Sequence, residues 1–344
     1  MMMRHTVVLL LLMALVPRPA PAQDDLVSVL INQIGFSTHD LMKLENGEAI
    51  IRAVKQDDKR EVMVVGAIKV RVETALILDG LTDVEGMRSR ESILAAGRFS
   101  SPPVPADVAL LELPSQDIEA LVDCEVGDCD IKLSADVLER LPASVDWLAD
   151  DYAEQASRFV RGEAVRYLSD YMSRGDAALV TYGDKDDPLS VEEGFDIIVA
   201  SGAYLDQIDP ILIDYLRDYP ENRPESVTEV YYWTLEDFGL KPVLNVRHLV
   251  ALDSTTAPIG DVFVVIRDIY ASHYFQAGLQ VFVLNAGPPQ NGQPSTYAVL
   301  AMRQRFDSKV GGLKRGMLEK KLRNGLRDML ESSKDQIERA HPRG

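Results

Sequence analysis

The stretch RDIYASHYFQAGLQVFVLN, Arg267 to Asn285, decides how the last third of the chain is built. Read at period two, one side of it is almost entirely apolar, with one histidine among the apolar residues. These side chains are Ile269, Ala271, His273, Phe275, Ala277, Leu279, Val281 and Val283. From Val262 to Leu284, Gly278 is the only glycine or proline. One straight strand of that length would exceed the usual roughly 3 to 10 residues. We therefore predict a strongly bent pair of segments, or a bulge, near Ser272.

A second strand carries a histidine on its apolar face. In KPVLNVRHLVAL, residues 241–252, His248 lies on the same period-two face as Leu244, Val246, Val250 and Leu252. A buried neutral imidazole must find hydrogen-bond partners or lose about 1 to 3 kcal/mol. The candidate partners are backbone carbonyls, Tyr270, Tyr274 and the polar end of a ligand.

Two interpretations of these histidines stay open. A single histidine on an apolar face is typical of a core residue whose hydrogen bonds are satisfied within the protein. If His248 and His273 lie on neighbouring strands, they would instead form a polar spot inside an apolar cavity, as in many ligand sites. The aromatic residues that suit either the wall of such a cavity or a plain core are Tyr231, Tyr232, Trp233 and Phe275.

The rest of the chain supplies more strands, a helical block and a final helix. Residues 50–72 read as a hairpin, residues 76–84 as a helix and residues 93–99 as a strand. From Pro102 to Pro220 the pattern is helical, and strands return after Pro224, with a turn expected from Gly287 to Pro294. An amphipathic helix runs from Val310 to the end.

Four glycines interrupt this last helix, at positions 311, 312, 316 and 325. Glycine costs a helix interior about 1 kcal/mol relative to alanine. We therefore expect a close approach of the helix to another surface or to a bound molecule. A helix that simply begins near Leu313 would explain the first two glycines but not Gly325.

This order of elements resembles the START-like, or polyketide cyclase-like, superfamily with its helix-grip fold. The resemblance covers roughly residues 45–99 and 227–339. It implies an α+β fold, in which a curved antiparallel sheet wraps around the long C-terminal helix and leaves an apolar cavity, with a large helical insertion. The chain also looks like uncharacterised exported bacterial proteins that share the stretches CEVGDCDIKL, VYYWTLEDFGLKPV and YASHYFQAGL.

Domain boundaries follow from these patterns. We expect a signal peptide over residues 1–22, because a basic start, an apolar run from Thr6 to Val16 and Ala20-Pro21-Ala22 fit an export signal and its cleavage site. The first part of the α+β domain then spans residues 23–101, the helical insertion residues 102–220, and the C-terminal strands and helix residues 221–344. No later apolar run approaches the roughly 20 residues of a transmembrane helix. We expect a periplasmic or secreted protein.

The charge and the cysteines limit the choice of partners. Residues 1–22 contain two arginines and no acidic residue, so their removal leaves 34 basic and 54 acidic residues. Such a surface repels phosphate backbones and argues against nucleic-acid binding. Cys124 and Cys129 flank Gly127, and an oxidising compartment favours a disulfide between them. Redox and metal roles remain open alternatives, although the spacing alone is a weak zinc signal.

No motif names a reaction, a cofactor or a metal site. The sequence lacks GxSxG, HExxH and an EF-hand loop, and the acidic turn Asp184 to Asp187 lacks the glycine and the glutamate of a calcium loop. Three functions therefore stand. The first is a carrier or sensor that holds a hydrophobic, lipid-like ligand in an internal cavity. The second is a cavity enzyme of cyclase or hydrolase type that uses His273 and His248 as acid/base groups, and the third is an interaction protein that docks through the acidic helical insertion. The ligand contacts expected in the first are His248, His273, Trp233, Tyr270, Tyr274 and Phe275.

Overall fold

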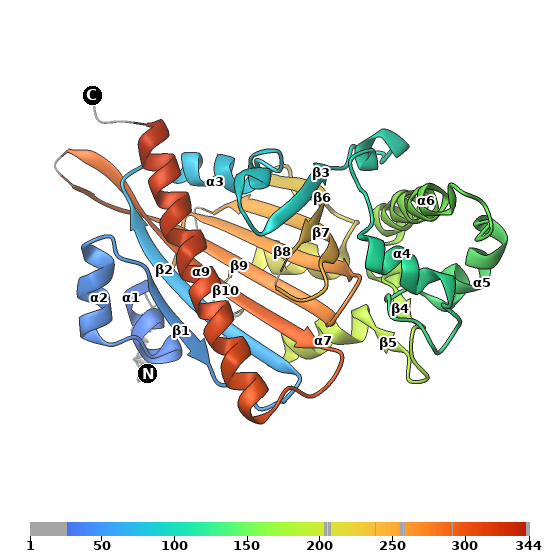
Figure 1. The fold of residues 1–344 in the computed structure, drawn as a ribbon. Coiled ribbons are helices and arrows are strands. Elements are labelled where there is room, and N and C mark those ends of the chain that lie inside the picture. Colours follow the sequence, from blue (N-terminus) through green and yellow to red (C-terminus); the bar gives the residue numbers. More distant parts are fainter. Residues whose placement is uncertain are drawn as a thin grey trace, which may run out of the picture.

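The computed structural model describes residues 26–341, apart from 203–204, 206–207, 238, 255–256, 258 and 291. Its centre is one antiparallel sheet of eight strands (Figure 1). The strands are β1 (Ile50–Val54), β2 (Glu61–Val70), β3 (Ile93–Arg98), β6 (Val227–Glu236), β7 (Val243–Asp253), β8 (Val262–Ala271), β9 (Phe275–Gln290) and β10 (Gln293–Phe306). Their order across the sheet is β1-β2-β10-β9-β8-β7-β6-β3. The predicted α+β class with a large antiparallel sheet and a C-terminal helix is confirmed.

The break predicted near Ser272 is confirmed as a hairpin turn. β8 ends at Ala271 and β9 begins at Phe275, and Tyr274 between them has a left-handed backbone with φ of 63°. The turn expected from Gly287 to Pro294 is shorter in the structure, because Gly287 still pairs with Ser295 and β9 continues to Gln290. β8 pairs with β9 only as far as Leu284, so the prolines that follow interrupt no ladder on that side.

One face of the sheet is covered by the C-terminal helix α9 (Gly312–Ala340) together with α3 (Thr74–Thr82) and the short helix η2 (Gly86–Ser89). α9 lies against β1 and β2 (Figure 1). Leu326 and Leu330 point at Gly66 of β2, where an added Cβ would lie 2.8 Å from Leu330 Cδ1 and 3.0 Å from Leu326 Cδ2. The glycine that permits the close approach is thus in the strand.

The glycines of α9 itself have a different environment. An added Cβ at Gly311, Gly312, Gly316 or Gly325 would meet no atom of the described chain within 4 Å. The expected close approach of these glycines to another part of the described chain is therefore wrong, and an approach to a bound molecule stays a prediction.

The other face of the sheet is covered by the segment between β3 and β6. Its helices are η3 (Pro105–Val108), α4 (Ser115–Val122), α5 (Ala135–Ser144), α6 (Tyr152–Arg174), η4 (Gly175–Ala178), α7 (Val191–Ala200) and α8 (Pro210–Asp218), and it adds the two-stranded sheet of β4 (Thr181–Tyr182) and β5 (Leu189–Ser190). The N-terminal helices α1 (Leu26–Val29), η1 (Leu30–Ile34) and α2 (Thr38–Glu45) add residues to the same core.

Most of the apolar face of residues 269–283 belongs to this second core, namely Ile269, Ala277, Leu279, Val281 and Val283. Leu279, Val281 and Val283 belong to the same buried cluster as residues of α5, α6 and α7, and α7 itself contacts β9. Leu326 and Leu330 of α9 belong to the core on the opposite face. The histidine-bearing face therefore looks toward the helical segment, and the prediction that it encloses a hollow together with α9 is wrong. Within the described ranges, no helix has both the length and the apolar character that crossing a bilayer requires.

Candidate functional site

A pocket of about 300 Å³ opens beside β6, between α8, the end of α6 and the chain that follows β3. Its walls combine apolar and aromatic side chains with polar ones, including two arginines, one glutamate and one serine. The lining residues are Arg98, Phe99, Ser101, Met172, Tyr215, Tyr219, Pro220, Arg223, Glu229, Val230 and Tyr231. This volume lies at the lower end of the roughly 300 to 1,000 Å³ typical of ligand sites.

Local sequence rules place these side chains. The alternation of β6 puts Glu229 and Tyr231 on the face that the helical segment covers. Asp209 caps α8 by accepting a hydrogen bond from the backbone N–H of Ile211, at 2.9 Å, and Pro210 is pre-organised for the first helical turn. α8 then presents Tyr215 to the carboxylate of Glu229.

Glu229 is the centre of the polar base of the pocket. Its Oε1 atom accepts hydrogen bonds from the hydroxyls of Tyr215 (2.8 Å) and Tyr231 (3.1 Å), and it lies 3.0 Å from Nε2 of His248. Its Oε2 atom pairs with Arg223 Nη1 at 3.1 Å. Tyr219 is joined to Tyr231 by a hydroxyl–hydroxyl bond of 2.8 Å, so the network reaches the pocket wall.

His248 lies fully buried behind this network. Its ring stacks on Tyr231, with centroids 4.5 Å apart, and contacts Tyr219 at 4.7 Å. Its Nδ1 atom lies 2.9 Å from the hydroxyl of Tyr171. The oxygen of that hydroxyl accepts a hydrogen bond from Arg267 Nη1 at 3.3 Å. Because both ring nitrogens already have hydrogen-bond partners within the protein, the imidazole does not line the pocket and is connected to it only through those partners.

Burial and hydrogen bonding together determine the protonation state of His248 and Glu229. Burial lowers the pKa of His248, more than the hydrogen bond to Glu229 raises it. Burial opposes ionisation of Glu229 as well, but the hydrogen bonds from His248 and Tyr215 and the charge of Arg223 leave the pKa of that carboxyl below its ordinary value. We therefore assign a neutral His248 that donates from Nε2 to an ionised Glu229. Burial also raises the pKa of Tyr219 to about 12.

His273 occupies a different cluster. It lies in the β8–β9 turn, and its Nε2 atom is 3.1 Å from Oδ1 of Asp117 in α4, with both side chains buried. The two histidines therefore have separate carboxylate partners and do not share one polar spot. Neither of the tyrosines considered as partners contacts them by a hydrogen bond in the described structure.

The other residues predicted to contact a ligand instead contact the helical segment, turns or neighbouring strands of the protein itself. Tyr270 donates to the backbone carbonyl of Lys132 at 2.8 Å, and Trp233 Nε1 donates to that of Asp107 at 2.9 Å. The Tyr274 hydroxyl accepts from the backbone N–H of Lys241 at 3.1 Å, and the Phe275 ring packs on Phe306 with centroids 5.0 Å apart. Of the six predicted ligand contacts, only His248 adjoins the pocket. Their role in binding stays a prediction.

Of the residues that line the pocket, sequence reasoning named only Tyr231, as a possible wall residue. Glu229 could have been found, because in VTEVYYW it lies on the same period-two face as Val227, Tyr231 and Trp233 and is as anomalous there as His248 is in β7. The register places Tyr231 directly opposite His248. Tyr171, Tyr215 and Tyr219 gave no such signal, since tyrosines on amphipathic helices are ordinary core residues.

Polar side chains also cluster on the α9 side of the sheet. Arg247 Nε donates to Asp268 Oδ1 at 2.6 Å, and its Nη1 atom pairs with Glu236. Gln304 Nε2 donates to Asp268 Oδ2 at 2.9 Å. An added Cβ at Gly278 would lie 2.0 Å from Asp268 Oδ2. The glycine noticed in the long strand pattern thus makes room for this buried network.

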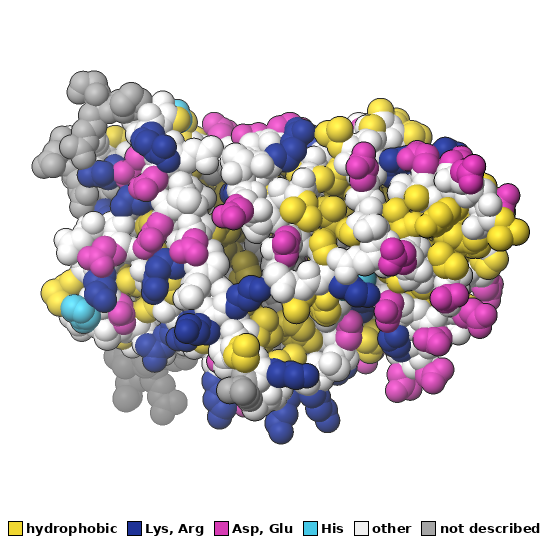
Figure 2. All heavy atoms as spheres, in the orientation of Figure 1, with side chains coloured by type: hydrophobic (Ala, Val, Ile, Leu, Met, Phe, Trp, Pro, Cys, Tyr) yellow, Lys and Arg dark blue, Asp and Glu magenta, His cyan; other side chains and the backbone are white. Residues whose placement is uncertain are grey.

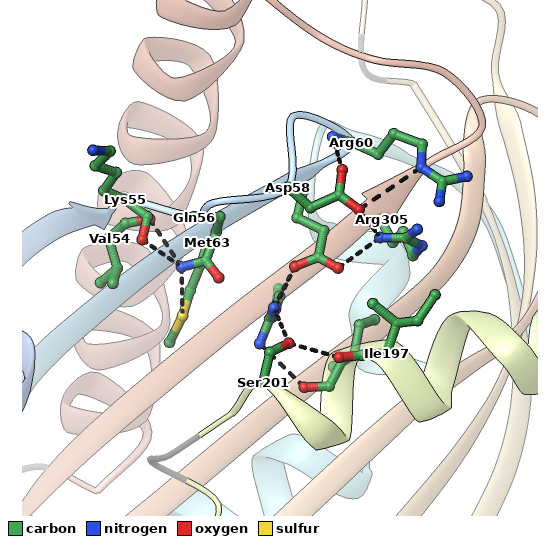
Figure 3. Close-up of polar contacts among 12 residues, drawn as sticks. Val54, Lys55, Gln56, Asp58, Arg60, Met63, Ile197, Ser201 and Arg305 are labelled. Carbon is green, nitrogen blue, oxygen red and sulfur yellow. Dashed lines mark hydrogen bonds and ion pairs between the residues drawn. The ribbon is translucent and has the colours of Figure 1, made fainter.

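A third charged cluster joins α7 to the sheet (Figure 3). Arg305 Nη1 donates to Asp58 at 2.8 Å and to Glu61 at 2.7 Å. Arg303 pairs with the same glutamate and donates to the Ser201 hydroxyl at the end of α7 at 2.7 Å. These contacts link β2, β10 and α7, which is typical of a structural cluster. Arg305 Nη2 is buried without a hydrogen-bond partner among the described residues.

The predicted disulfide between Cys124 and Cys129 is confirmed, with an S–S distance of 2.03 Å. The loop that it closes contacts the acidic turn Asp184 to Asp187, which was considered as a calcium-binding loop. The backbone N–H of Cys129 donates to the carbonyl of Asp184 at 3.0 Å. Within the part of the chain that the structure covers, no group of three or more His, Cys, Asp or Glu residues is arranged to hold a metal ion.

Comparison with known proteins adds little to this description. Neither a protein-family model nor a curated protein matches the sequence. Among solved structures, the chain is similar to a START superfamily protein from Mycobacterium smegmatis, at 14% identity, covering 44% of this chain and 92% of that chain. The likeness names the same superfamily as the sequence resemblance, but its TM-score of 0.25 carries no argument about fold or function.

Proposed function

We propose that this protein binds one small hydrophobic, lipid-like ligand, as a carrier or a sensor, in the pocket beside β6. The observation that carries the proposal is a concave site of about 300 Å³ whose apolar and aromatic walls converge on a few fixed polar groups. This pocket takes the place of the hollow that was expected beneath α9.

The lining indicates the kind of ligand. Phe99, Met172 and Tyr219 offer an apolar surface, and a volume this small suits a single ring system or one short chain. Arg98 and Arg223 line the same pocket. Arg223 is partly neutralised by Glu229, whereas the structure records no acidic partner for Arg98 among the described residues. A ligand with an apolar body and one acidic or hydroxyl group fits this arrangement.

Mass spectrometry of an organic extract tests the proposal. Protein purified from its native host should release one co-purified compound. The variant Met172→Trp, which fills the pocket from α6, should release none, and Met42→Trp, on an exposed position of α2, should retain it. A clean extract from the unmodified protein, or a compound retained by Met172→Trp, would contradict the proposal.

The enzyme alternative, with His248 and His273 as acid/base groups, receives less support. Acid/base catalysis needs a side chain within hydrogen-bond reach of a bound substrate. Both ring nitrogens of His248 are occupied inside the protein, and His273 is buried against Asp117. The proposal of binding without turnover therefore takes precedence.

One observation favours the interaction protein as a second candidate. Residues 102–220 contain 27 acidic and 8 basic residues, a net charge of −19, and the segment exposes Leu148 (98%) and Leu110 (60%). Leu148→Ser should lose a bound protein partner that the unmodified protein retains. The control Leu94→Ser changes an exposed residue outside the segment and should retain that partner. Equal retention by both variants would count against this candidate.

Export remains part of the proposal. The predicted signal peptide, residues 1–22, lies outside the described residues. The Cys124–Cys129 disulfide supports a periplasmic or secreted location, since structural disulfides persist in oxidising compartments. The domain boundaries at residues 22, 101 and 220 likewise stay predictions.

A further inference from the structure

Charge is distributed very unevenly along this chain. Residues 102–220 carry −19, so the remaining 27 acidic and 28 basic residues sum to +1, which together give the formal charge of −18. Within that remainder, residues 309–327 hold seven basic residues and one acidic residue. This basic segment comprises residues 309–311 and the beginning of α9. The acidic helices α4, α5 and α6 lie at the far end of the molecule (Figure 1).

Most of these basic side chains are exposed and unpaired. Arg315 pairs with Glu319 at 2.8 Å. Lys309, Lys314, Lys320, Arg323 and Arg327, which we call the basic face, are all exposed. None of them forms an ion pair with another described residue. Lys and Arg side chains gather visibly over this end of α9 (Figure 2).

Helix stability does not explain this concentration of charge. The first turns of a helix carry the positive end of its dipole, where cations are unfavourable and acidic residues are preferred. This effect is confined to about the first turn, where α9 carries Lys314 and Arg315 and no acidic residue. Residues 328–340 of α9 contain four acidic and two basic residues. Lys314 and Arg315 are therefore unfavourable at the start of α9, and an anionic partner would offset that cost.

Exposed apolar side chains accompany the basic face. Met317 is 66% exposed and Leu240 is 65% exposed. The β6–β7 turn, which carries Leu240, approaches α9 at Lys321, because an added Cβ at Gly239 would lie 2.6 Å from Lys321 Nζ. Apolar side chains among Lys and Arg are typical of helices that lie in the interface of an anionic membrane. A polyanion such as a nucleic acid would use the cations alone.

We propose that the basic face of α9, with Met317 and Leu240, docks on the surface of a membrane rich in anionic phospholipid. The open space around Gly311, Gly312 and Gly316 lets a flat surface come close to the helix backbone. The acidic segment is repelled by the same surface and is held away from it, which orients the molecule. This inference concerns a surface separate from the pocket and does not depend on the proposed ligand.

Co-sedimentation with vesicles tests the docking surface. The full-length protein should bind vesicles of phosphatidylcholine mixed with phosphatidylglycerol, and bind vesicles of phosphatidylcholine alone far more weakly. Each cation near an anionic surface contributes roughly a fivefold gain in affinity. The triple variant Lys314→Gln, Lys320→Gln, Arg323→Gln should therefore bind on the order of 100-fold more weakly.

A matched control separates position from net charge. The triple variant Arg158→Gln, Arg174→Gln, Arg217→Gln removes the same charge from side chains that are 58 to 66% exposed on the acidic segment. It should bind no more weakly than the unmodified protein. Met317→Ser should weaken binding and leave its salt dependence unchanged. Equal loss in both triple variants, unchanged binding by Met317→Ser, or displacement of the protein from vesicles by DNA would overturn the proposal.

Discussion

Glu229 is the residue whose replacement tests the described site most directly. The change Glu229→Gln preserves the shape of the side chain and removes its charge. In the protein, Oε1 receives three hydrogen bonds from neutral donors, those of Tyr215, Tyr231 and His248, at 2.8 to 3.1 Å. An amide oxygen can accept the same bonds, so the variant isolates the contribution of the charge.

The magnitude follows from these contacts. A hydrogen bond to a charged group contributes about 1 kcal/mol more than its neutral counterpart, which gives about 3 kcal/mol for three bonds. The pair with Arg223, whose side chain is 51% exposed, adds less than about 1 kcal/mol. Relief of the burial cost of the carboxylate acts in the opposite direction. Because the pKa of Glu229 is lowered despite burial, its partners outweigh that cost, and we expect a net loss of about 2 kcal/mol.

Urea denaturation followed by tryptophan fluorescence measures the change in the free energy of unfolding. The control Glu225→Gln removes a charge from an exposed side chain four residues earlier in the sequence and should stay within about 0.5 kcal/mol of the unmodified protein. If Glu229→Gln also stays within that range at neutral pH, the carboxylate is not the charged centre of this network and our reasoning is wrong.

Three further predictions follow from the buried groups. In the folded state the pKa of His248 is lower than its ordinary value of 6.5, so below about pH 6.5 the unfolded chain binds a proton that the folded chain excludes. The free energy of unfolding should therefore fall by up to about 1.4 kcal/mol per pH unit as the pH is lowered. A pH series of urea midpoints on His248→Gln should lack this slope, and an unchanged slope would refute the assignment. Gly278→Ala should cost about 3 kcal/mol, since its Cβ would collide with Asp268 Oδ2; a thermal midpoint equal to that of the unmodified protein would show that the network can move aside. Cys124→Ser with Cys129→Ser should lose about 2 kcal/mol for a loop this short; a loss that persists when both proteins are compared under reducing conditions would point to packing instead of the cross-link.

The strands of the C-terminal half could be predicted well because their patterns are local. Period-two alternation in residues 262–284 located β8 and β9, and the excess length indicated a bend or a bulge near Ser272, where the structure has a turn. Gly278 was recognised as an exception in the pattern. A side chain is excluded there by the carboxylate of Asp268 on the adjacent strand, and this contact depends on a pairing register that alternation alone does not give.

The candidate site could be predicted only in part. His248 was identified because a polar side chain on an apolar strand face is a local anomaly. Its partners lie far away in sequence: Tyr171 is 77 residues before it and Glu229 is 19 residues before it. The choice between a satisfied core residue and a member of a shared polar spot depended on those partners. The structure gives each histidine its own carboxylate and places the pocket at the far side of Glu229.

The sequence by itself determined the class of the elements, the position of the main turn, the disulfide between nearby cysteines and the segregation of charge, because each of these is set by residues close together in the chain. Only the tertiary structure decided which core each apolar face joins. Period-two alternation defines two faces of a strand without saying which of them meets α9, and that choice depends on how a 119-residue segment packs against the sheet. The pocket beside β6 was settled in the same step, since its walls come from segments that meet only when that packing is complete.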